Sequence, residues 1–217
     1  MILAISTGNG SPHKTRCLES VASQSAEHVH VYTDAAEQAT PRGAMENQWR
    51  TLEQAGQSYD GNTVAVLVDG DDWLPHPDCL ARVQAEHEAG AWLTWGSFVF
   101  ADGRPGIAAE YGADDPRSTP WRMSHLKSFR LGLFWKLDRG DVQRDGAWLE
   151  HSRDLAVMLP LYELCPPERR RFIPDVIYTY NLAASFEWTA SPADLAREQL
   201  DVAYVRSRPR YAAVERL

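Results

Sequence analysis

Cysteine is scarce in this chain, and its pattern argues against two classes of small protein. Cys17, Cys79 and Cys165 are the three cysteines among 217 residues, and they lie far apart, outside any Cys-x-x-Cys or Cys/His spacing. Because a zinc site or a disulfide scaffold requires such spacing, the sequence favours neither. We interpret the three as small apolar side chains of a protein from the reducing cytoplasm.

Long hydrophobic runs and an excess of basic residues are also lacking. No segment reaches the ~18 consecutive apolar residues of a membrane helix, and the N-terminus lacks the basic start and long apolar stretch of a signal peptide. We therefore expect no integral membrane association. The 22 Lys and Arg are outnumbered by 30 Asp and Glu, which gives a formal net charge of −8. This charge argues against a whole-chain electrostatic grip on nucleic acid, although it permits a local basic groove.

The first seventy residues alternate between strand and helix patterns. The expected elements are strands at 2–6, 28–33 and 63–68, and helices at 13–24 and 43–56. This order predicts an α/β fold with a mostly parallel central sheet flanked by helices. Ligands bind such sheets beyond the carboxyl ends of the strands. Polar clusters stand at three of these ends: 7–9, Asp34 and 69–72.

The second half is less regular, but it shows no repeat and no linker. The expected elements are helices at 77–88, 123–135, 154–164 and 192–207, and strands at 91–100 and 176–180. Residues 101–120 are rich in Gly, Pro and Asp and predict a long loop, a type of segment that often serves as a functional lid. We expect a single domain over residues 1–217.

The segment Asp69-Gly70-Asp71-Asp72 carries the clearest chemical signal. Three carboxylates within four residues repel one another unless a cation lies between them. Ligand sets made of oxygen alone favour Mg²⁺ or Mn²⁺, and such an ion would neutralise charge on a departing phosphate. A plain acidic surface turn is the alternative, because Asp-Gly is common in turns.

Several segments together resemble the family 2 glycosyltransferases of the GT-A fold. The resemblance rests on Ile2–Asn9, LESVASQ at 18–24, Val29–Asp34, Asn47 within MENQWRTLEQ, VAVLVDGDDWL at 64–74, WLTWGSF at 92–98, SHLKSFRLGLF at 124–134, DLAVMLPLYEL at 154–164 and FIPDVIYTYN at 172–181. It spans nearly the whole chain. It implies a nucleotide-sugar-binding half at 1–100, and an acceptor-side half with a C-terminal helix at 101–217. Small stand-alone proteins of this type also occur in bacteriophages.

The resemblance further implies which residues bind the nucleotide sugar and the metal. Thr7, Asn9 and Asp34 would contact the nucleoside, and the alternative for Thr7 and Asn9 is that they cap the following helix. Asn47 would lie beside the nucleotide, unless it is an ordinary exposed helical residue. The aspartates of the acidic segment have separate roles: Asp71 is the best direct metal ligand, Asp69 faces the metal or the ribose, and Asp72 is a ligand or caps the next helix.

Transfer with inversion needs a base that takes the proton of the acceptor hydroxyl. The resemblance implies that Asp154, at the start of a helix, is this catalytic base. The alternative is a helix N-cap or a first-turn Asp that is stabilised by the helix dipole. Asp145 is the second choice, although Asp145-Gly146 also fits a plain turn.

Cationic and aromatic side chains near the loop form the remaining candidate set. Arg122, His125 or Lys127 would contact the diphosphate or an anionic acceptor. We expect Trp95 and Trp121 to form a stacking platform, and Trp92 and Trp135 to pack in the core. The basic run 206–210 is either a solvated helix end or a phosphate contact.

The sequence thus predicts an inverting, metal-dependent glycosyltransferase that uses Mn²⁺ or Mg²⁺ and a nucleoside-diphosphate sugar, with a UDP-sugar as the expected donor. The acceptor hydroxyl would belong to a saccharide, a lipid-linked glycan or a hydroxymethylated pyrimidine in DNA. Two alternatives stay open: a nucleotidyltransferase or sugar-nucleotide pyrophosphorylase, and a non-catalytic nucleotide-sugar binder. The first normally has a Gly-rich loop with Arg and Lys, which residues 6–14 do not reproduce well.

Overall fold

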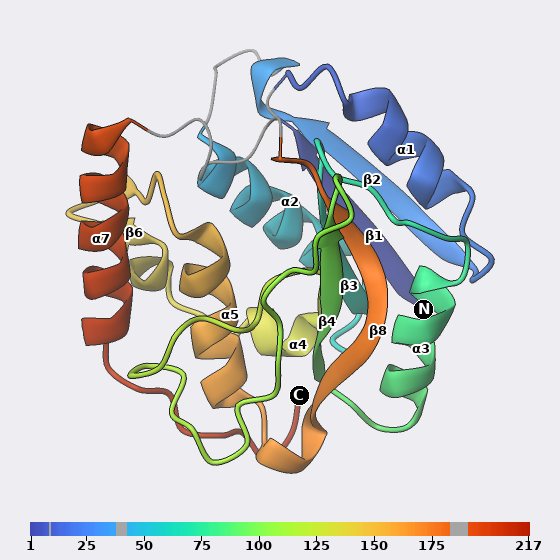
Figure 1. Ribbon diagram of the computed structural model, residues 1–217. Helices are drawn as coiled ribbons and strands as arrows, with labels where there is room; N and C mark the ends of the chain where they lie inside the picture. Colours follow the sequence, from blue (N-terminus) through green and yellow to red (C-terminus); the bar gives the residue numbers. More distant parts are fainter. Residues whose placement is uncertain (9, 38–42, 183–190) are drawn as a thin grey trace.

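A six-stranded sheet in the order β2-β1-β3-β5-β4-β8 forms the centre of the computed structural model (Figure 1). The structure describes residues 1–8, 10–37, 43–182 and 191–217. The strands of this sheet are β1 Ile2–Gly8, β2 His28–Asp34, β3 Val64–Asp69, β4 Leu93–Phe100, β5 Lys127–Arg130 and β8 Arg170–Tyr180. The α-helices are α1 Lys14–Ala22, α2 Ala44–Ser58, α3 Cys79–Glu88, α4 Leu131–Phe134, α5 Arg153–Leu164 and α7 Pro192–Ser207.

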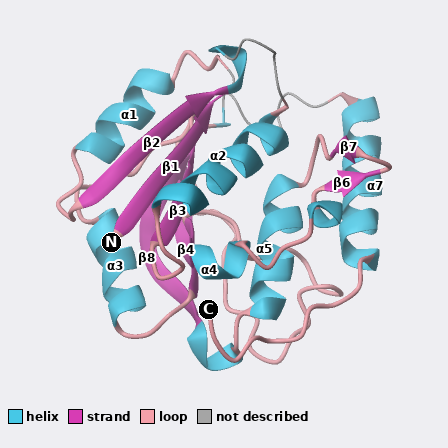
Figure 2. Ribbon diagram, turned by 180° about the vertical axis from the view of Figure 1, so that it is seen from behind, coloured by secondary structure: helices cyan, strands magenta, loops and turns pink. Residues whose placement is uncertain are grey.

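Helices cover both faces of the sheet, and the strands alternate their side chains between two cores. Leu3 and Ile5 of β1 point to the core with α2, α4 and α5, whereas Ile2 and Ala4 point to the core with α1 and α3. Figure 2 shows the sheet and its covering helices from behind. The strand β1 pairs in parallel with β2 and β3, and β4 pairs in parallel with β8. The predicted α/β fold with a mostly parallel sheet is therefore confirmed.

The predicted helix at 123–135 is wrong. Residues 127–130 form β5, which runs antiparallel between β3 and β4, and only the short α4 follows. Because this central strand is covered on both faces, Lys127, Ser128 and Phe129 are all buried, and the strand lacks the alternating pattern of a half-exposed one.

The register of the sheet brings polar strand ends together. Thr7 lies opposite Asp69, and Gly8 lies opposite Asp34. On the other side of β3, Leu67 pairs with Lys127, so Asp69 and His125 lie two residues beyond this antiparallel pair.

The turn after β3 approaches β1 closely at Gly70. Its N–H donates to the carbonyl of Thr7 at 2.9 Å, and a Cβ at Gly70 would lie 2.8 Å from the Cα of Gly8. A larger residue would therefore push the acidic segment away from β1.

Two further strands, β6 Gln143–Arg144 and β7 Ala147–Trp148, form a hairpin that the sequence reasoning missed. Asp145 and Gly146 form its turn with φ of 53° and 80°, as tight hairpin turns require. The Asp145-Gly146 turn itself was expected.

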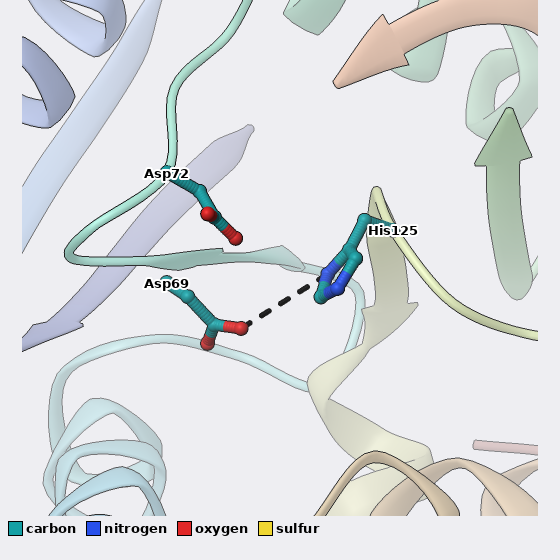
Figure 3. Close-up of side chains that lie close together, drawn as sticks. All are labelled: Asp69, Asp72 and His125. Carbon is teal, nitrogen blue, oxygen red and sulfur yellow. Dashed lines mark ion pairs between the residues drawn. The ribbon is translucent and has the colours of Figure 1, made fainter. Parts of the chain in front are cut away.

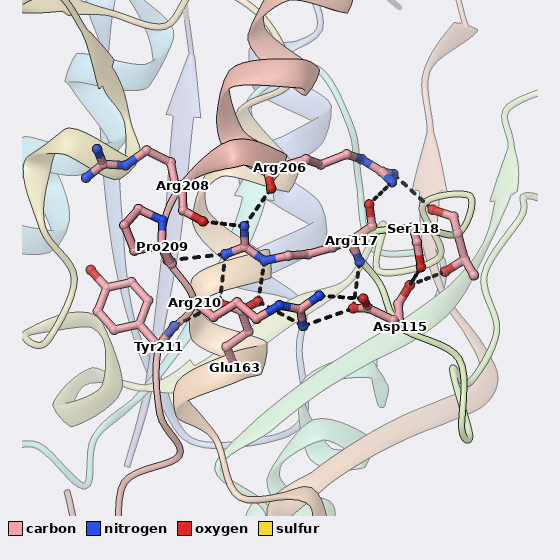
Figure 4. Close-up of polar contacts among 10 residues, drawn as sticks. Asp115, Arg117, Ser118, Glu163, Arg206, Arg208, Pro209, Arg210 and Tyr211 are labelled. Carbon is pink, nitrogen blue, oxygen red and sulfur yellow. Dashed lines mark hydrogen bonds and ion pairs between the residues drawn. The ribbon is translucent and has the colours of Figure 1, made fainter.

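Loop 101–126 is fixed to the C-terminal segment by Arg117 (Figure 4). The Arg117 guanidinium pairs with Glu163 and donates to the carbonyls of Arg206, Arg208 and Pro209. Both side chains of the Arg117–Glu163 pair are more than 90% buried. Among the described residues, no helix combines the length and apolar character needed to cross a membrane.

Candidate functional site

A cavity of about 340 Å³ lies between the carboxyl ends of β3, β4 and β8, the start of α5, and α7, and this volume is in the range of small-molecule sites. Its lining combines carboxylates, cationic groups and aromatic rings. The lining residues are Asp69, Phe98, Phe100, Trp121, Ser124, His125, Glu150, His151, Ser152, Arg153, Asp154, Leu155, Tyr180, Glu198, Val202 and Arg206. The predicted strand-end aspartate and the predicted base therefore lie on the wall of one cavity.

Asp69, Asp72 and His125 bring three potential metal-ligand atoms within 4.8 Å of one another. Asp69 ends β3, Asp72 lies in the following turn, and His125 precedes β5 (Figure 3). The Nδ1 of His125 lies 4.0 Å from Oδ2 of Asp69. Two carboxylates and an imidazole are a donor set that suits a divalent cation such as Mn²⁺.

Tyr178 of β8 contacts all three members of this group. Its hydroxyl donates to Oδ2 of Asp72 at 2.7 Å and accepts from the backbone N–H of Asp69 at 3.1 Å. Its ring stacks on His125 with centroids 4.5 Å apart. Because Tyr178 is fully buried, this single side chain fixes the relative placement of the three groups.

Asp72 is the most deeply buried carboxylate of the Asp69–Asp72 segment, with 1% of its surface exposed. Its second oxygen accepts from the N–H of Asn181 at 2.8 Å, so it does not cap the next helix, which begins after Asp78. Burial and the neighbouring charges of Asp69 and Asp71 hold the pKa of Asp72 well above its usual range. A nearby cation would remove this cost of ionisation.

His125 has the properties of a neutral imidazole. Burial, reinforced by the charge of Lys127, lowers the pKa of His125 to about 4. Its Nδ1 is buried and has no hydrogen-bond partner among the described residues. A buried nitrogen without a partner is costly, and coordination of a cation would satisfy it.

The buried Lys127 connects this group with Asp154. Its ammonium forms an ion pair with Oδ1 of Asp154 and lies 4.0 Å from Oδ2 of Asp69. Burial alone would lower the pKa of Lys127, but the two carboxylates outweigh it and raise that pKa. In turn, Lys127 overcomes the effect of burial on Asp154 and lowers the pKa of the carboxyl group. Asp154 is therefore ionised at neutral pH.

Asp154 lies in the first turn of α5, and Arg153 precedes it. The guanidinium of Arg153 feels the charges of Asp69, Asp154 and Asp71, which raise its pKa despite burial. Asp71 lies outside the close donor group of Asp69, Asp72 and His125. Burial and Asp69 raise the pKa of Asp71.

Thr7 and Asp34 lie at the carboxyl ends of β1 and β2, and neither lines this cavity. Thr7 is inside β1 and does not cap α1, which begins after His13. The Asp34 carboxylate accepts from the N–H groups of Gly10 and Ala36 and from the Tyr32 hydroxyl. Asn9 lies outside the described residues.

Asn47 is buried rather than exposed, and its amide donates to the carbonyl of Thr33 at 3.2 Å. Arg122 pairs with Asp114 at 2.8 Å within loop 101–126 and does not line the cavity. Asp145 is exposed at the hairpin turn and also lies away from the cavity.

Trp95 and Trp135 do not lie where the sequence predicts them. Trp95 is buried among Tyr111, Tyr162 and Phe172, so it belongs to the core and offers no stacking platform. Trp121 does line the cavity. Trp135 was expected in the core but is 47% exposed.

The basic run 206–210 is largely neutralised within the chain. Arg208 faces Asp141, and Arg210 pairs with Asp115 at 2.5 Å. Arg206 donates to the carbonyls of Arg117 and Thr119 and lines the cavity. This part of the chain therefore presents no continuous phosphate-binding surface.

Tyr178, Arg153, Ser152 and Arg206 were not singled out individually by the sequence reasoning as site residues. Arg153 and Ser152 directly precede Asp154, which was the one available signal for them. Tyr178 lies in an ordinary strand pattern, and only the pairing of β8 with β4 brings it under the site.

The arrangement of sheet, helices and acidic strand end defines a GT-A-like fold. Solved structures of S. aureus TarS are similar to this chain. One has a TM-score of 0.63 and 18% identity over 93% of this chain and 38% of that chain. A structure of TarS 1-349 in complex with UDP-GlcNAc has a TM-score of 0.57 and 12% identity over 97% and 68% of the two chains. A UDP complex of TarS 1-349 has a TM-score of 0.58 and 17% identity over 93% and 64%.

The chain thus spans well under half of the first of these TarS chains. Neither a protein-family model nor a curated protein matches the sequence.

Proposed function

We propose that the chain is a metal-dependent glycosyltransferase that transfers a sugar from a UDP-sugar to an acceptor hydroxyl with inversion at the anomeric carbon. The observation that carries the proposal is the pair of carboxylates, Asp69 and Asp154, on the wall of one cavity in a GT-A-like fold. The similar TarS structures that contain UDP and UDP-GlcNAc support a UDP-sugar as the donor.

Asp69, Asp72 and His125 would hold the divalent cation. Their donor atoms lie close enough together, and the Nδ1 of His125 has no partner among the described residues. When bound, Mn²⁺ or Mg²⁺ would neutralise charge on the diphosphate leaving group. We keep Asp71 as a further candidate ligand, because it belongs to the same turn.

Asp154 would act as the base. As the acceptor oxygen forms its bond to the anomeric carbon, the bond from that carbon to the diphosphate oxygen breaks and UDP leaves. The hydroxyl proton passes to the Asp154 carboxylate, which Lys127 keeps ionised. The lowered pKa is compatible with this role, since the hydroxyl becomes strongly acidic only while the new bond forms.

Residues 1–100 would bind the donor, and residues 101–217 would bind the acceptor. Thr7, Asn9, Asp34 and Asn47 would border the nucleoside. His125 would serve the cation rather than the diphosphate, and Arg122 would support loop 101–126 rather than contact the donor.

The experiment that tests this function measures UDP release from UDP-GlcNAc and other UDP-sugars with Mn²⁺ in the presence of a mixture of acceptor saccharides, and with EDTA as the control. We expect metal-dependent release that falls at least ~100-fold in Asp69→Asn. Asp145→Asn is the matched control, because this exposed turn residue lies outside the cavity. No UDP release from any UDP-sugar, or equal loss in both variants, would contradict the proposal.

A further inference from the structure

Trp135, which directly follows α4, lies on the surface of the protein. Its exposed fraction is 47%, the largest among the tryptophan, tyrosine and phenylalanine side chains that the structure describes. Tryptophan is highly buried on average, and the other elements of the fold do not cover this ring. The contacts that hold it in place show how it is presented to solvent.

Two glycines allow the indole of Trp135 to lie against the protein backbone. A Cβ at Gly56 of α2 would lie 2.7 Å from Nε1 of this indole, and a Cβ at Gly61 would lie 3.1 Å from its Cζ3. Because Nε1 and Cζ3 belong to different rings of the indole, both ends of the ring system are in close contact with backbone that carries no side chain. These contacts hold the indole in place and leave the rest of its surface open.

A surface depression of about 370 Å³ adjoins the exposed part of Trp135, and this volume is in the range of small-molecule sites. Trp49, Glu53 and Gln57 of α2 line it, together with Phe134 and Trp135. The rings of Trp49 and Phe134 pack edge to face with centroids 4.8 Å apart, and both residues are buried. The depression therefore has a rigid aromatic floor.

Three polar groups of this depression are available to a ligand. The indole N–H of Trp135 and the amide of Gln57 form no hydrogen bond with any residue that the structure describes. The carboxylate of Glu53 accepts from Trp49 at 2.8 Å and from Arg139 at 2.7 Å, in both cases through Oε1. Its Oε2 is therefore left to accept from a ligand.

The charges of the depression disfavour an anionic ligand. Burial alone would raise the pKa of Glu53, but the hydrogen bonds from Arg139 and Trp49 outweigh it and lower that pKa. Glu53 is therefore ionised at neutral pH. The described residues that line the depression include no lysine or arginine, and the guanidinium of Arg139 already pairs with Glu53.

A neutral saccharide matches both the rings and the polar groups. The apolar C–H face of a sugar ring packs on an open indole face. Sugar hydroxyls donate to a carboxylate or an amide oxygen and accept from indole and amide N–H groups.

The depression lies at the opposite edge of the sheet from the catalytic cavity. Arg130, at the end of β5, pairs with Val64, the first residue of β3, whereas Asp69 is the last residue of β3. A strand of this length spans roughly 17 Å, and the chain continues from Arg130 through α4 to Trp135. A saccharide at Trp135 would therefore leave the donor site and Asp154 unoccupied.

We propose that Trp135, Glu53 and Gln57 form a second ligand site, separate from the catalytic cavity, which binds a neutral oligosaccharide or a segment of a neutral polysaccharide chain. The site holds such a chain on the surface of the protein and thereby raises its effective concentration near the cavity. Its existence does not depend on the proposed transfer, because saccharide binding is measurable without turnover.

The test follows the indole N–H signals of Trp135 and Trp121 by NMR of the ¹⁵N-labelled protein, assigned with Trp135→Phe and Trp121→Phe. The probes are cellohexaose, maltohexaose, laminarihexaose and the hexamer of N-acetylglucosamine, with a heparin hexasaccharide as the anionic control. We expect at least one neutral hexasaccharide to shift the Trp135 signal, and heparin to leave it unchanged. No shift of Trp135 with any neutral hexasaccharide, a shift confined to Trp121, or a shift with heparin alone would overturn the inference.

Substitutions at Trp135 separate stacking on a ring from plain apolar contact. Isothermal titration calorimetry uses the hexasaccharide that shifts the signal. Trp135→Phe keeps an aromatic face and should weaken binding by no more than about 3-fold, whereas Trp135→Leu should weaken it at least about 10-fold. The matched control is Leu200→Ala, which shortens an exposed apolar side chain on α7 and should bind as the wild type does. Equal binding by the Phe and Leu variants would contradict a stacking site.

Gln57→Ala should weaken binding by about 3–10-fold, the usual effect of one hydrogen bond. Gln54→Ala is its control, because Gln54 is an exposed glutamine of the same helix that does not line the depression. Equal weakening in both variants would count against the site.

A second copy of this chain is the other possible occupant, and sedimentation velocity tests it. We expect a monomer at the concentrations used for NMR. A wild-type dimer that Trp135→Leu dissociates would assign this face to a protein interface and overturn the inference. UDP release tests the proposed transfer separately, so a protein that binds the hexasaccharide at Trp135 but releases no UDP would contradict the proposed function alone.

Discussion

Lys127 provides the sharpest test of the electrostatics of the site. Its side chain is 2% exposed, and its ammonium lies between two carboxylates, in an ion pair with Asp154 and 4.0 Å from Asp69. Lys127→Met keeps the length and apolar stem of the side chain but leaves Asp154 without its cation. Breaking a buried pair in this way costs about 3–5 kcal/mol. Because the Asp154 side chain is 30% exposed in the cavity, water compensates part of this loss and we expect about 3 kcal/mol.

The assay is thermal unfolding followed by circular dichroism. For a chain of this size, a loss of about 3 kcal/mol corresponds to a fall in Tm of about 6–12 °C. Lys136→Met is the control, since Lys136 is exposed, and its Tm should change by less than about 2 °C. The double variant Lys127→Met/Asp154→Asn should recover part of the loss, because it removes the uncompensated charge. A Tm for Lys127→Met that equals the wild-type value would refute the reasoning.

Three further perturbations follow from individual contacts. Tyr178→Phe removes the hydroxyl that holds Asp72 and should weaken Mn²⁺ binding about 10-fold, measured by isothermal titration calorimetry; unchanged affinity would contradict the positioning role. Burial lowers the pKa of His87 from 6.5 to about 4. Between these two pH values the unfolded chain binds a proton at His87 and the folded chain does not, so the free energy of unfolding should fall by about 2 kcal/mol from pH 7.5 to pH 5. Urea unfolding at both pH values measures this difference, and in His87→Asn the free energy of unfolding should fall by about 2 kcal/mol less than in the wild type. Arg117→Met breaks the buried pair with Glu163 and should lower the free energy of unfolding by at least about 3 kcal/mol. Limited proteolysis should then cleave loop 101–126 faster than in the wild type, and cleavage at the wild-type rate would show that the pair does not fix the loop.

The sequence predicted the first half of the fold because its elements carry strong local patterns. The strand at 63–68 is a continuous apolar run, and the helix at 43–56 has a clear apolar stripe. Asp34 and Asp69 lie at the same edge of the sheet, because β2 and β3 run parallel to β1 and end there. The position of Asp154 came from resemblance, and the structure places it on the cavity wall beside Asp69.

What the sequence did not predict depends on pairing between distant segments. The sequence of β5 predicts a helix, because a strand buried on both faces has no alternation of polar and apolar residues. The burial of Lys127 is explained only by the carboxylates of Asp154 and Asp69 beside it. His125 joins the acidic group through the antiparallel register of β3 and β5, which no local pattern encodes. Trp121, Ser152 and Arg206 come together on the cavity wall only in the tertiary structure.

The central claim, that Asp154 takes the acceptor proton opposite the donor held by the acidic cluster, is tested most directly by Asp154→Asn. Turnover and donor affinity are measured on the same samples, as UDP release with Mn²⁺ and an acceptor saccharide, and as calorimetric binding of the UDP-sugar without the acceptor. We expect turnover to fall at least ~100-fold, while the donor Kd changes by no more than about 3-fold. An Asp154→Asn variant that retains full turnover would contradict the account.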